Sequence, residues 1–176
     1  PYTTMDNDFL PKGYDDVKIE KESDYMKMKD DGEYRIRFLS SPIVGIECWK
    51  NKKPLRFRSK DEVPNETWDI NTFTGKPKSP VTFWAAIVWN YGAKRMQILS
   101  ITQSTIQGAI EELTKDEDWG SPLAYDLKIT RTTTDKTEYS VRPVVPSPLD
   151  PLIEAEYGMC KWKLEALFDG ADPFAG

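Results

Sequence analysis

Histidine is absent from the 176-residue sequence, and cysteine occurs only at Cys48 and Cys160. The absence of histidine excludes Ser-His-Asp and Cys-His catalysis and any histidine general base. A structural zinc site needs about four nitrogen or sulfur ligands, and two distant cysteines without CxxC spacing do not supply them. We therefore expect no metal and no other cofactor. A disulfide between the two cysteines would be unusual in a cytoplasmic protein.

Long apolar runs are also missing. No stretch approaches the roughly 18 consecutive apolar residues of a membrane-spanning helix. No basic segment followed by an apolar core marks a secretory signal peptide. We therefore expect a cytoplasmic protein with no membrane partner.

Positive charge is scarce overall but concentrated in one segment. The formal net charge is −5, with −4 in residues 1–32, +6 in residues 33–95 and −7 in residues 96–176. A basic segment between acidic ends permits local polyanion binding that the global charge would discourage. The chain also has six tryptophans, and aromatic side chains beside cations can stack bases and neutralise phosphates.

Two hairpins are predicted from runs of β-branched and aromatic residues. Residues 81–101, VTFWAAIVWNYGAKRMQILSI, read as two strands around the turn Tyr91–Lys94, with Gly92 supplying the permissive backbone. Residues 43–50 and 55–58 form a second hairpin around residues 51–54. Strict alternation predicts further half-buried strands; these cover residues 33–39, 123–131 and 138–145.

Two helices are predicted. Residues 104–115 carry an apolar stripe at i, i+4 and i+7, and Ser104 with Gln107 matches a capping box. Asp150 followed by proline favours the start of a final helix that reaches about residue 167, with a break at Gly158. A short helical turn is expected near residues 23–28.

The order of these elements predicts the fold class. Without residues 43–80, the chain runs strand, strand, strand, helix, strand, strand, which is the order of the five-stranded OB-fold Greek-key barrel. We predict a mainly β protein with four parts. These are an N-terminal arm (1–32), an OB-fold domain (33–148) with an inserted hairpin and long loop between strands 1 and 2 (43–80), a C-terminal helix (149–168) and an acidic tail (169–176).

Several short phrases carry a family resemblance. They are YRIRFLSSP at 34–42 followed by Gly45 and Trp49, the stretch from Trp84 to Trp89, residues 98–103, DWG at 118–120, YDLKITR at 125–131 and the proline-rich exit at 143–151. In this order they resemble the OB-fold single-stranded DNA-binding proteins of tailed bacteriophages. The resemblance implies sequence-independent binding and protection of single-stranded DNA during phage-type replication and recombination, in the host cytoplasm.

The C-terminus carries a second resemblance. Bacterial and phage proteins of this function often end in an acidic Pro-Phe tail that recruits replication and repair proteins, and Asp169, Asp172, Pro173 and Phe174 are similar to it. Ala175 and Gly176 follow here, whereas such a tail ends on the Phe carboxylate. The alternative is a frayed C-terminus.

We predict a DNA groove with the 81–101 hairpin as floor and the upstream basic residues as walls. Five cations within residues 50–58 repel one another unless a polyanion neutralises them. Trp84 and Trp89 point to opposite faces of one strand, which favours Trp84 as a stacking residue. The candidate ssDNA-binding residues are Arg35, Arg37, Trp49, Lys50, Lys52, Lys53, Arg56, Arg58, Trp68, Phe73, Lys76, Trp84, Tyr91, Lys94 and Arg95. For each of them, core packing or a solvated, acid-paired surface is the alternative.

Three other functions remain open at this point. An RNA-binding OB-fold protein would use the same stackable bases, and a protein-interaction adaptor would use the barrel as a scaffold. A metal-dependent nuclease would need carboxylates, and the densest acidic cluster is Asp116–Asp118. That cluster is better explained as solvating a helix end, so we predict no catalytic residues and no enzyme.

Overall fold

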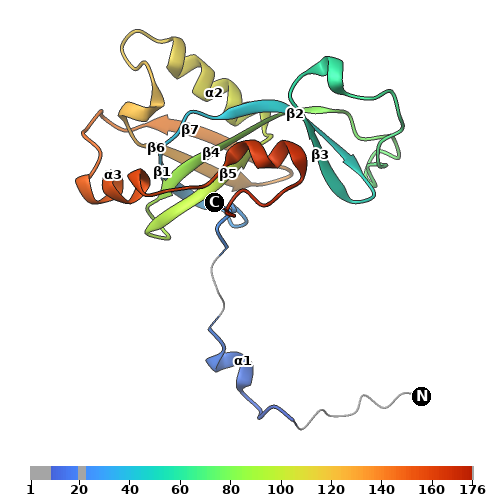
Figure 1. The fold of residues 1–176 in the computed structure, drawn as a ribbon, viewed down its shortest axis with the longest axis horizontal. Coiled ribbons are helices and arrows are strands. Elements are labelled where there is room, and N and C mark those ends of the chain that lie inside the picture. Colours follow the sequence, from blue (N-terminus) through green and yellow to red (C-terminus); the bar gives the residue numbers. More distant parts are fainter. Residues whose placement is uncertain (1–8, 20–22, 176) are drawn as a thin grey trace.

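The computed structural model describes residues 9–19 and 23–175. One antiparallel sheet has the strand order β3-β2-β4-β1-β6-β7, with β5 paired to β4 (Figure 1). The strands are β1 (Gly32–Phe38), β2 (Ile43–Lys50), β3 (Lys53–Phe57), β4 (Val81–Asn90), β5 (Arg95–Ile101), β6 (Leu127–Thr133) and β7 (Thr137–Pro143). The prediction of a mainly β protein is confirmed.

The helical elements are short. The α-helices are α1 (Tyr14–Val17), α2 (Ser104–Lys115) and α3 (Pro151–Gly158), and the 3-10 turns are η1 (Lys60–Glu62), η2 (Pro122–Ala124) and η3 (Leu164–Asp169). Within the part of the chain that is described, no helix has the length and apolar character needed to cross a bilayer.

Strand β4 is the centre of the sheet. Its first half pairs with β2, its last three residues pair with β1, and β5 pairs along most of its other edge. Both faces of β4 are buried: Ala86 and Val88 belong to one apolar core, and Ala85 and Ile87 to another. A strand buried on both faces needs no polar alternation, which explains the continuous apolar run in its sequence.

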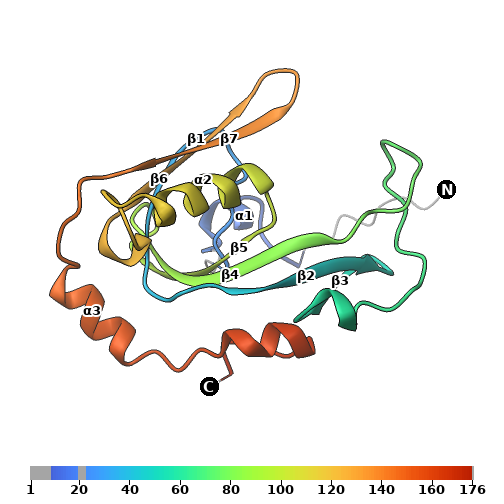
Figure 2. The ribbon, with the colours of Figure 1, turned by 90° about the horizontal axis from the view of Figure 1, so that it is seen from above.

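Helix α2 covers the first core. Figure 2 shows it between β4 and the β6–β7 hairpin, with Ile106 and Ile110 buried. The predicted bounds of this helix are confirmed, but the capping box is wrong. Gln103 occupies the N-cap without a side-chain bond, and the Gln107 side chain instead donates through Nε2 to the carbonyls of Thr82 and Ile101, both at 2.9 Å.

The C-terminal segment covers the second core, on the opposite face of β4 (Figure 2). Asp150 caps α3 by accepting from the Leu152 amide, and the helix ends at Gly158 as expected. The predicted continuation to residue 168 is wrong, because a non-helical stretch precedes η3. Phe174 packs edge-on against Trp162, with ring centroids 4.8 Å apart.

Both predicted hairpins are present, with one correction at a turn. In the β2–β3 turn, Asn51 and Lys52 both have positive φ, at 53° and 63°. In the β4–β5 turn the positive φ belongs to Lys94, at 54°, and not to Gly92. The Gly92 amide instead donates to the Asn90 side chain at 3.1 Å, so an Asx turn positions this residue.

The β2–β3 hairpin is not a separate insertion. Residues 43–47 of β2 pair with residues 81–85 of β4, so β2 continues the main sheet. Residues 48–50 of β2, the turn, β3 and the loop up to residue 80 lie outside that pairing. The insertion therefore begins later than the sequence indicated.

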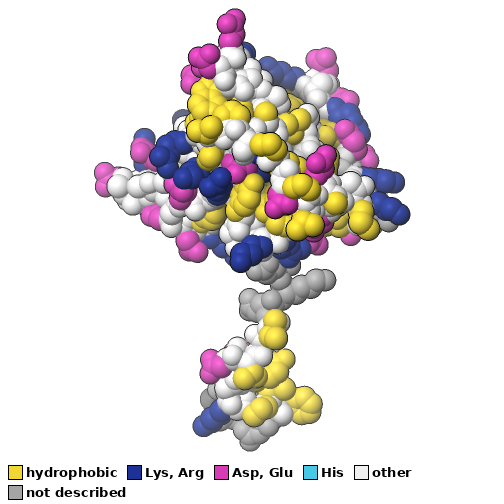
Figure 3. Space-filling view, turned by 90° about the vertical axis from the view of Figure 1, so that its left-hand side faces the viewer, with side chains coloured by type: hydrophobic (Ala, Val, Ile, Leu, Met, Phe, Trp, Pro, Cys, Tyr) yellow, Lys and Arg dark blue, Asp and Glu magenta, His cyan; other side chains and the backbone are white. Residues whose placement is uncertain are grey.

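The described N-terminal residues form two parts, one packed on the sheet and one around α1. Tyr25 forms a parallel bridge with Ile98 of β5, and Met26 is buried, so the helical turn expected near residues 23–28 is wrong. Figure 3 shows the segment around α1 as a separate lobe with apolar side chains on its surface. Those with large exposed fractions include Leu10, Tyr14, Val17 and Ile19.

Candidate nucleic-acid interface

The predicted site residues lie at opposite ends of β4. At about 3.3 Å per residue, this ten-residue strand spans about 30 Å. The β2–β3 hairpin and its following loop extend beyond Val81, and the β4–β5 turn lies at the other end (Figure 1). The first end carries Trp49, Lys50, Lys52, Lys53, Arg56, Arg58, Trp68, Phe73 and Lys76, and the second carries Arg35, Arg37, Tyr91, Lys94 and Arg95.

Asp69 organises the first end. Its carboxylate accepts hydrogen bonds from the backbone amides of Asn51 (2.9 Å) and Lys52 (2.7 Å), the two left-handed residues of the β2–β3 turn. The Asp69 amide donates to the Trp49 carbonyl, and the Asp69 carbonyl accepts from the Lys78 amide. The hydrogen bond from the Lys52 backbone amide is the main reason why the pKa of Asp69 is lowered. Asp69 therefore fixes the loop to the hairpin while remaining charged.

Trp49 has a cation against its ring. The Lys78 ammonium lies 5.0 Å from the Trp49 ring centroid, within the range of a cation–π contact. These two residues line an open pocket of about 560 Å³ together with Asn51, Lys52, Asp69, Ile70 and Thr72. Its volume falls within the range of about 300–1,000 Å³ typical of ligand sites.

Lys52 and Lys78 line this pocket, and two further lysines are close to them in sequence: Lys53 follows Lys52, and Lys76 precedes Lys78 by two residues. Lys52, Lys53 and Lys76 are exposed, and the ion pairs found within the described residues do not include them or Lys78. Lys50 differs because its ammonium donates to the Thr67 carbonyl at 2.7 Å. We define the tip cluster as Trp49, Lys52, Lys53, Lys76 and Lys78. Lys78 was not predicted as a site residue, although its position two residues after Lys76 was a usable signal.

The two arginines of β3 and its exit have partners within the chain. Arg56 pairs with Glu47 at 3.1 Å and lies 4.6 Å from the Phe83 ring centroid. Arg58 pairs with Glu165 at 3.4 Å and lies 4.7 Å from the Phe168 ring centroid. Both therefore belong to the face that the C-terminal segment covers.

Trp68 is buried, with 8% of its surface exposed. Its ring lies 6.4 Å from that of Phe57, because the loop after β3 folds back over the hairpin. The expectation that Trp68 is available for stacking is therefore wrong. Phe73, in contrast, is 98% exposed.

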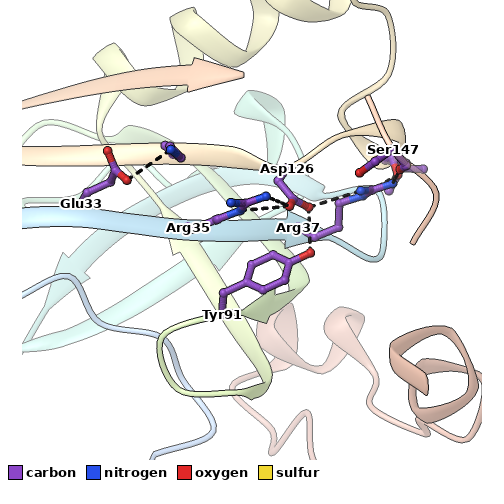
Figure 4. A network of polar contacts seen from close by, with 8 residues as sticks. Glu33, Arg35, Arg37, Tyr91, Asp126 and Ser147 are labelled. Carbon is purple, nitrogen blue, oxygen red and sulfur yellow. Dashed lines mark hydrogen bonds and ion pairs between the residues drawn. The ribbon is translucent and has the colours of Figure 1, made fainter. Parts of the chain in front are cut away.

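A polar network occupies the second end (Figure 4). Arg37 is 3% exposed. Its guanidinium donates to the Leu123 and Ser147 carbonyls, both at 3.0 Å, and to Asp126 at 3.3 Å. The expected outward position of Arg37 is therefore wrong, because η2 and the chain after β7 cover this end of β1.

Arg35 and Tyr91 share the same carboxylate. Arg35 donates to Asp126 at 2.8 Å and lies 5.3 Å from the Tyr91 ring centroid. The Tyr91 hydroxyl donates to Asp126 at 2.9 Å. Burial, assisted by this carboxylate, raises the pKa of Tyr91 to about 12. Arg35 keeps a side chain that is 44% exposed, so it alone of the two arginines can reach a ligand.

The β4–β5 turn adds a second, weaker group of cations. Lys94 is exposed, and Arg95 pairs with Asp24. Beside them is an open pocket of about 300 Å³ that includes Lys27, Lys29 and Tyr34. Lys27 and Lys29 were not predicted as site residues, because the bridge between Tyr25 and β5, which brings them to this end, leaves no local pattern in the sequence.

Trp84 and Trp89 are both half-buried, each against a different core. The inference that one of them must face a free surface is wrong, because the sheet has a core on each side. Trp84 also lines an apolar pocket of about 230 Å³ beside α2 and η2, with Phe38, Pro42 and Leu123 among its neighbours.

The remaining predictions concern the tail, the cysteines and metals. Pro173 is buried and its carbonyl accepts from the Lys163 amide, so a partner of this tail would have to displace it. Both cysteines are free. Across residues 9–19 and 23–175, no three acidic or cysteine side chains gather into a possible metal site.

Comparison with protein-family models, curated proteins and solved structures found no match for this chain.

Proposed function

We propose that this protein binds single-stranded DNA without sequence preference, through the tip cluster. The observation that carries the proposal is the half-buried Trp49 ring, with the Lys78 ammonium beside it and Lys52 in the same pocket. Lys53 and Lys76 are exposed on the adjoining hairpin and loop. Sequence-tolerant binding combines cations for the backbone with an aromatic surface for bases, and each stacked base contributes about 1–3 kcal/mol. Asp69 supports the arrangement because it holds the hairpin turn and the loop in one geometry.

The proposed fold assignment is an elaborated OB-fold. Strand β1 lies between β4 and β6, β4 continues into β5, and α2 separates β5 from the β6–β7 hairpin. This order supports the assignment. Among the described strands, β5 and β7 do not pair with each other. In the proposed barrel, packed side chains would therefore close the gap between these two strands. Helix α2 and the first core lie there.

The proposed biological role is the protection and organisation of single-stranded DNA during phage-type replication or recombination. It rests on the family resemblance of the sequence. RNA binding would use the same tip cluster, and a protein adaptor would not need it. A titration with DNA and RNA therefore distinguishes these two alternatives from each other.

The test is a fluorescence titration with oligo-dT of about 20 nucleotides, which covers the roughly 4–16 nucleotide footprint of one OB-fold. The same titration is repeated with single-stranded RNA and with duplex DNA. We expect quenching of tryptophan fluorescence by oligo-dT and weaker binding of the duplex. Trp49→Phe should remove most of the quenching, and Trp162→Phe should retain it. Unchanged fluorescence and anisotropy with every nucleic acid would refute the proposal and favour an adaptor.

A further inference from the structure

Phe73 is the most exposed large apolar side chain in the described chain, at 98%. It lies on an ordered loop. Ile70 and Pro77 form an antiparallel bridge, and the Asn71 amide donates to the Lys76 carbonyl at 2.8 Å. Within the loop, the Asn71 side-chain oxygen accepts from the Phe73 amide at 2.9 Å. Phe73 therefore projects into solvent from a defined backbone.

This loop is also fixed relative to Trp49. Asp69 and Lys78, at its two ends, are joined to each other by a backbone hydrogen bond of 2.7 Å. Asp69 is joined to Trp49 by a second one of 2.9 Å. Phe73 lies outside the pocket that Trp49 lines. The preceding residue, Thr72, does line this pocket, so Phe73 lies at the edge of the pocket, where a strand leaving Trp49 can reach it.

The charge around Phe73 suits a second DNA strand. Lys76 is three residues away on the same loop, Lys52 lies on the adjoining hairpin turn and Lys53 begins β3. Proteins that insert an apolar side chain between base steps unstack them, with cations nearby to hold the phosphates. A rigidly held, fully exposed phenylalanine among lysines has the features of such a wedge.

We propose that Phe73 is a wedge that separates base pairs where single-stranded DNA meets a duplex. This activity goes beyond single-strand binding and rests on it: the tip cluster holds the single strand, and Phe73 unstacks the first base pair. The Phe73 ring acts by insertion, so its size and apolar character matter more than its hydrogen bonding.

The test uses a DNA hairpin with an oligo-dT tail and a 2-aminopurine in the first base pair, whose fluorescence rises when the base unstacks. Wild type, Phe73→Ala, Phe73→Trp and Leu152→Ala are compared at equal occupancy of the tail. Leu152 is 79% exposed on α3 and is the control for loss of an exposed apolar side chain. Since Phe73 is exposed, the unfolding midpoint should be the same for wild type and Phe73→Ala.

We expect Phe73→Ala to bind oligo-dT within about threefold of wild type and to open the junction about tenfold less, a factor equal to about 1.4 kcal/mol. Phe73→Trp and Leu152→Ala should open it as wild type does. Equal opening by Phe73→Ala would overturn the wedge. So would a loss of oligo-dT affinity with unchanged opening at equal occupancy, which would make Phe73 a stacking surface only. Failure of wild type to bind oligo-dT would instead refute the proposed function, and would favour a protein partner for Phe73.

Discussion

Arg37 and Asp126 form an ion pair in which both side chains are 4% exposed, with Nη1 and Oδ1 3.3 Å apart. The same carboxylate accepts from Arg35 and from the Tyr91 hydroxyl. Asp126, the residue before β6, therefore links β1 to the β4–β5 turn. This places Arg37 in the framework of the fold and not at a ligand-binding surface.

Asp126→Asn should lower the free energy of unfolding by about 3–5 kcal/mol, because it leaves the buried Arg37 charge without its partner. Urea denaturation at pH 7 measures the change. Asp135→Asn, at the exposed β6–β7 turn, is the matched control and should stay within about 0.5 kcal/mol of wild type. The folded Asp126→Asn protein should bind oligo-dT normally. An unchanged midpoint with weakened DNA binding would instead make the network part of the interface.

The raised pKa of Tyr91 predicts that the free energy of unfolding falls at alkaline pH. Its pKa is raised to about 12, so the folded state favours the neutral hydroxyl more than the unfolded state does. The stabilisation is complete below pH 10, where tyrosine ionises in the unfolded chain, and is lost as pH rises from about 10 towards 12. The free-energy difference between wild type and Tyr91→Phe should therefore fall over that interval. A difference that stayed constant from pH 9 to 11.5 would contradict the raised pKa.

The tip lysines predict the salt dependence of binding. Each phosphate contact with single-stranded DNA contributes about −0.7 to the slope of log K against log salt. Replacing Lys52, Lys53, Lys76 and Lys78 by alanine should therefore make the slope up to about 3 units shallower. The control replaces four other lysines by alanine, giving the same net charge: Lys115, Lys136, Lys161 and Lys163. Equal slopes for the two variants would show that overall charge, and not the tip cluster, governs binding.

Local patterns predicted the elements well where the deciding contacts are also local. The apolar stripe of residues 104–115 predicted α2 to the residue, and the density of cations after Trp49 pointed to Lys52 and Lys53 of the tip cluster. Arg37 was assigned wrongly for the opposite reason. Its partners Asp126 and Ser147 lie 89 and 110 residues away along the chain. The alternation of residues along β1 carries no information on such distant partners.

The second core was the larger feature that the sequence patterns did not predict. Alternation along β4 assigns one face to the interior and one to solvent, but Ile153 and Leu167 from the C-terminal segment bury the second face. The apolar residues of that segment are spread over α3, η3 and the turns between them. No single period marks them as a covering layer. The availability of Arg56 and Arg58 was overestimated for this reason, whereas Trp84 packs against the first core and Trp89 against the second.

Gly45 and Gly108 predict opposite effects of alanine. A Cβ at Gly45 would lie 2.4 Å from the Phe57 carbonyl oxygen and 2.7 Å from the Phe168 ring, whereas nothing lies within 4 Å at Gly108. Gly45→Ala should cost about 1–3 kcal/mol by overpacking. Gly108→Ala, inside α2, should stabilise by about 0.5–1 kcal/mol. Thermal or urea denaturation checks both. A neutral Gly45→Ala would mean that neither Phe57 of β3 nor Phe168 of η3 is held this close to β2.

The C-terminal tail predicts a loss of stability when it is removed. Phe174 packs against Tyr25 at 5.1 Å and Trp162 at 4.8 Å between ring centroids, and Pro173 accepts from the Lys163 amide. Deleting residues 169–176 should therefore lower the urea midpoint. Phe174→Ala alone should account for part of the loss, about 0.5–3 kcal/mol. Deleting only residues 175 and 176 should have little effect.

The same deletion separates packing from competition with DNA. The ion pairs of the described residues do not join Asp169 or Asp172 to the tip lysines, and the tail lies on the second core. We therefore expect the affinity for oligo-dT at low salt to change by less than about twofold, equivalent to about 0.4 kcal/mol. Asp169→Asn with Asp172→Asn removes the charge while keeping Phe174. A rise in affinity shared by this variant and the deletion would show that the acidic tail competes for the DNA site.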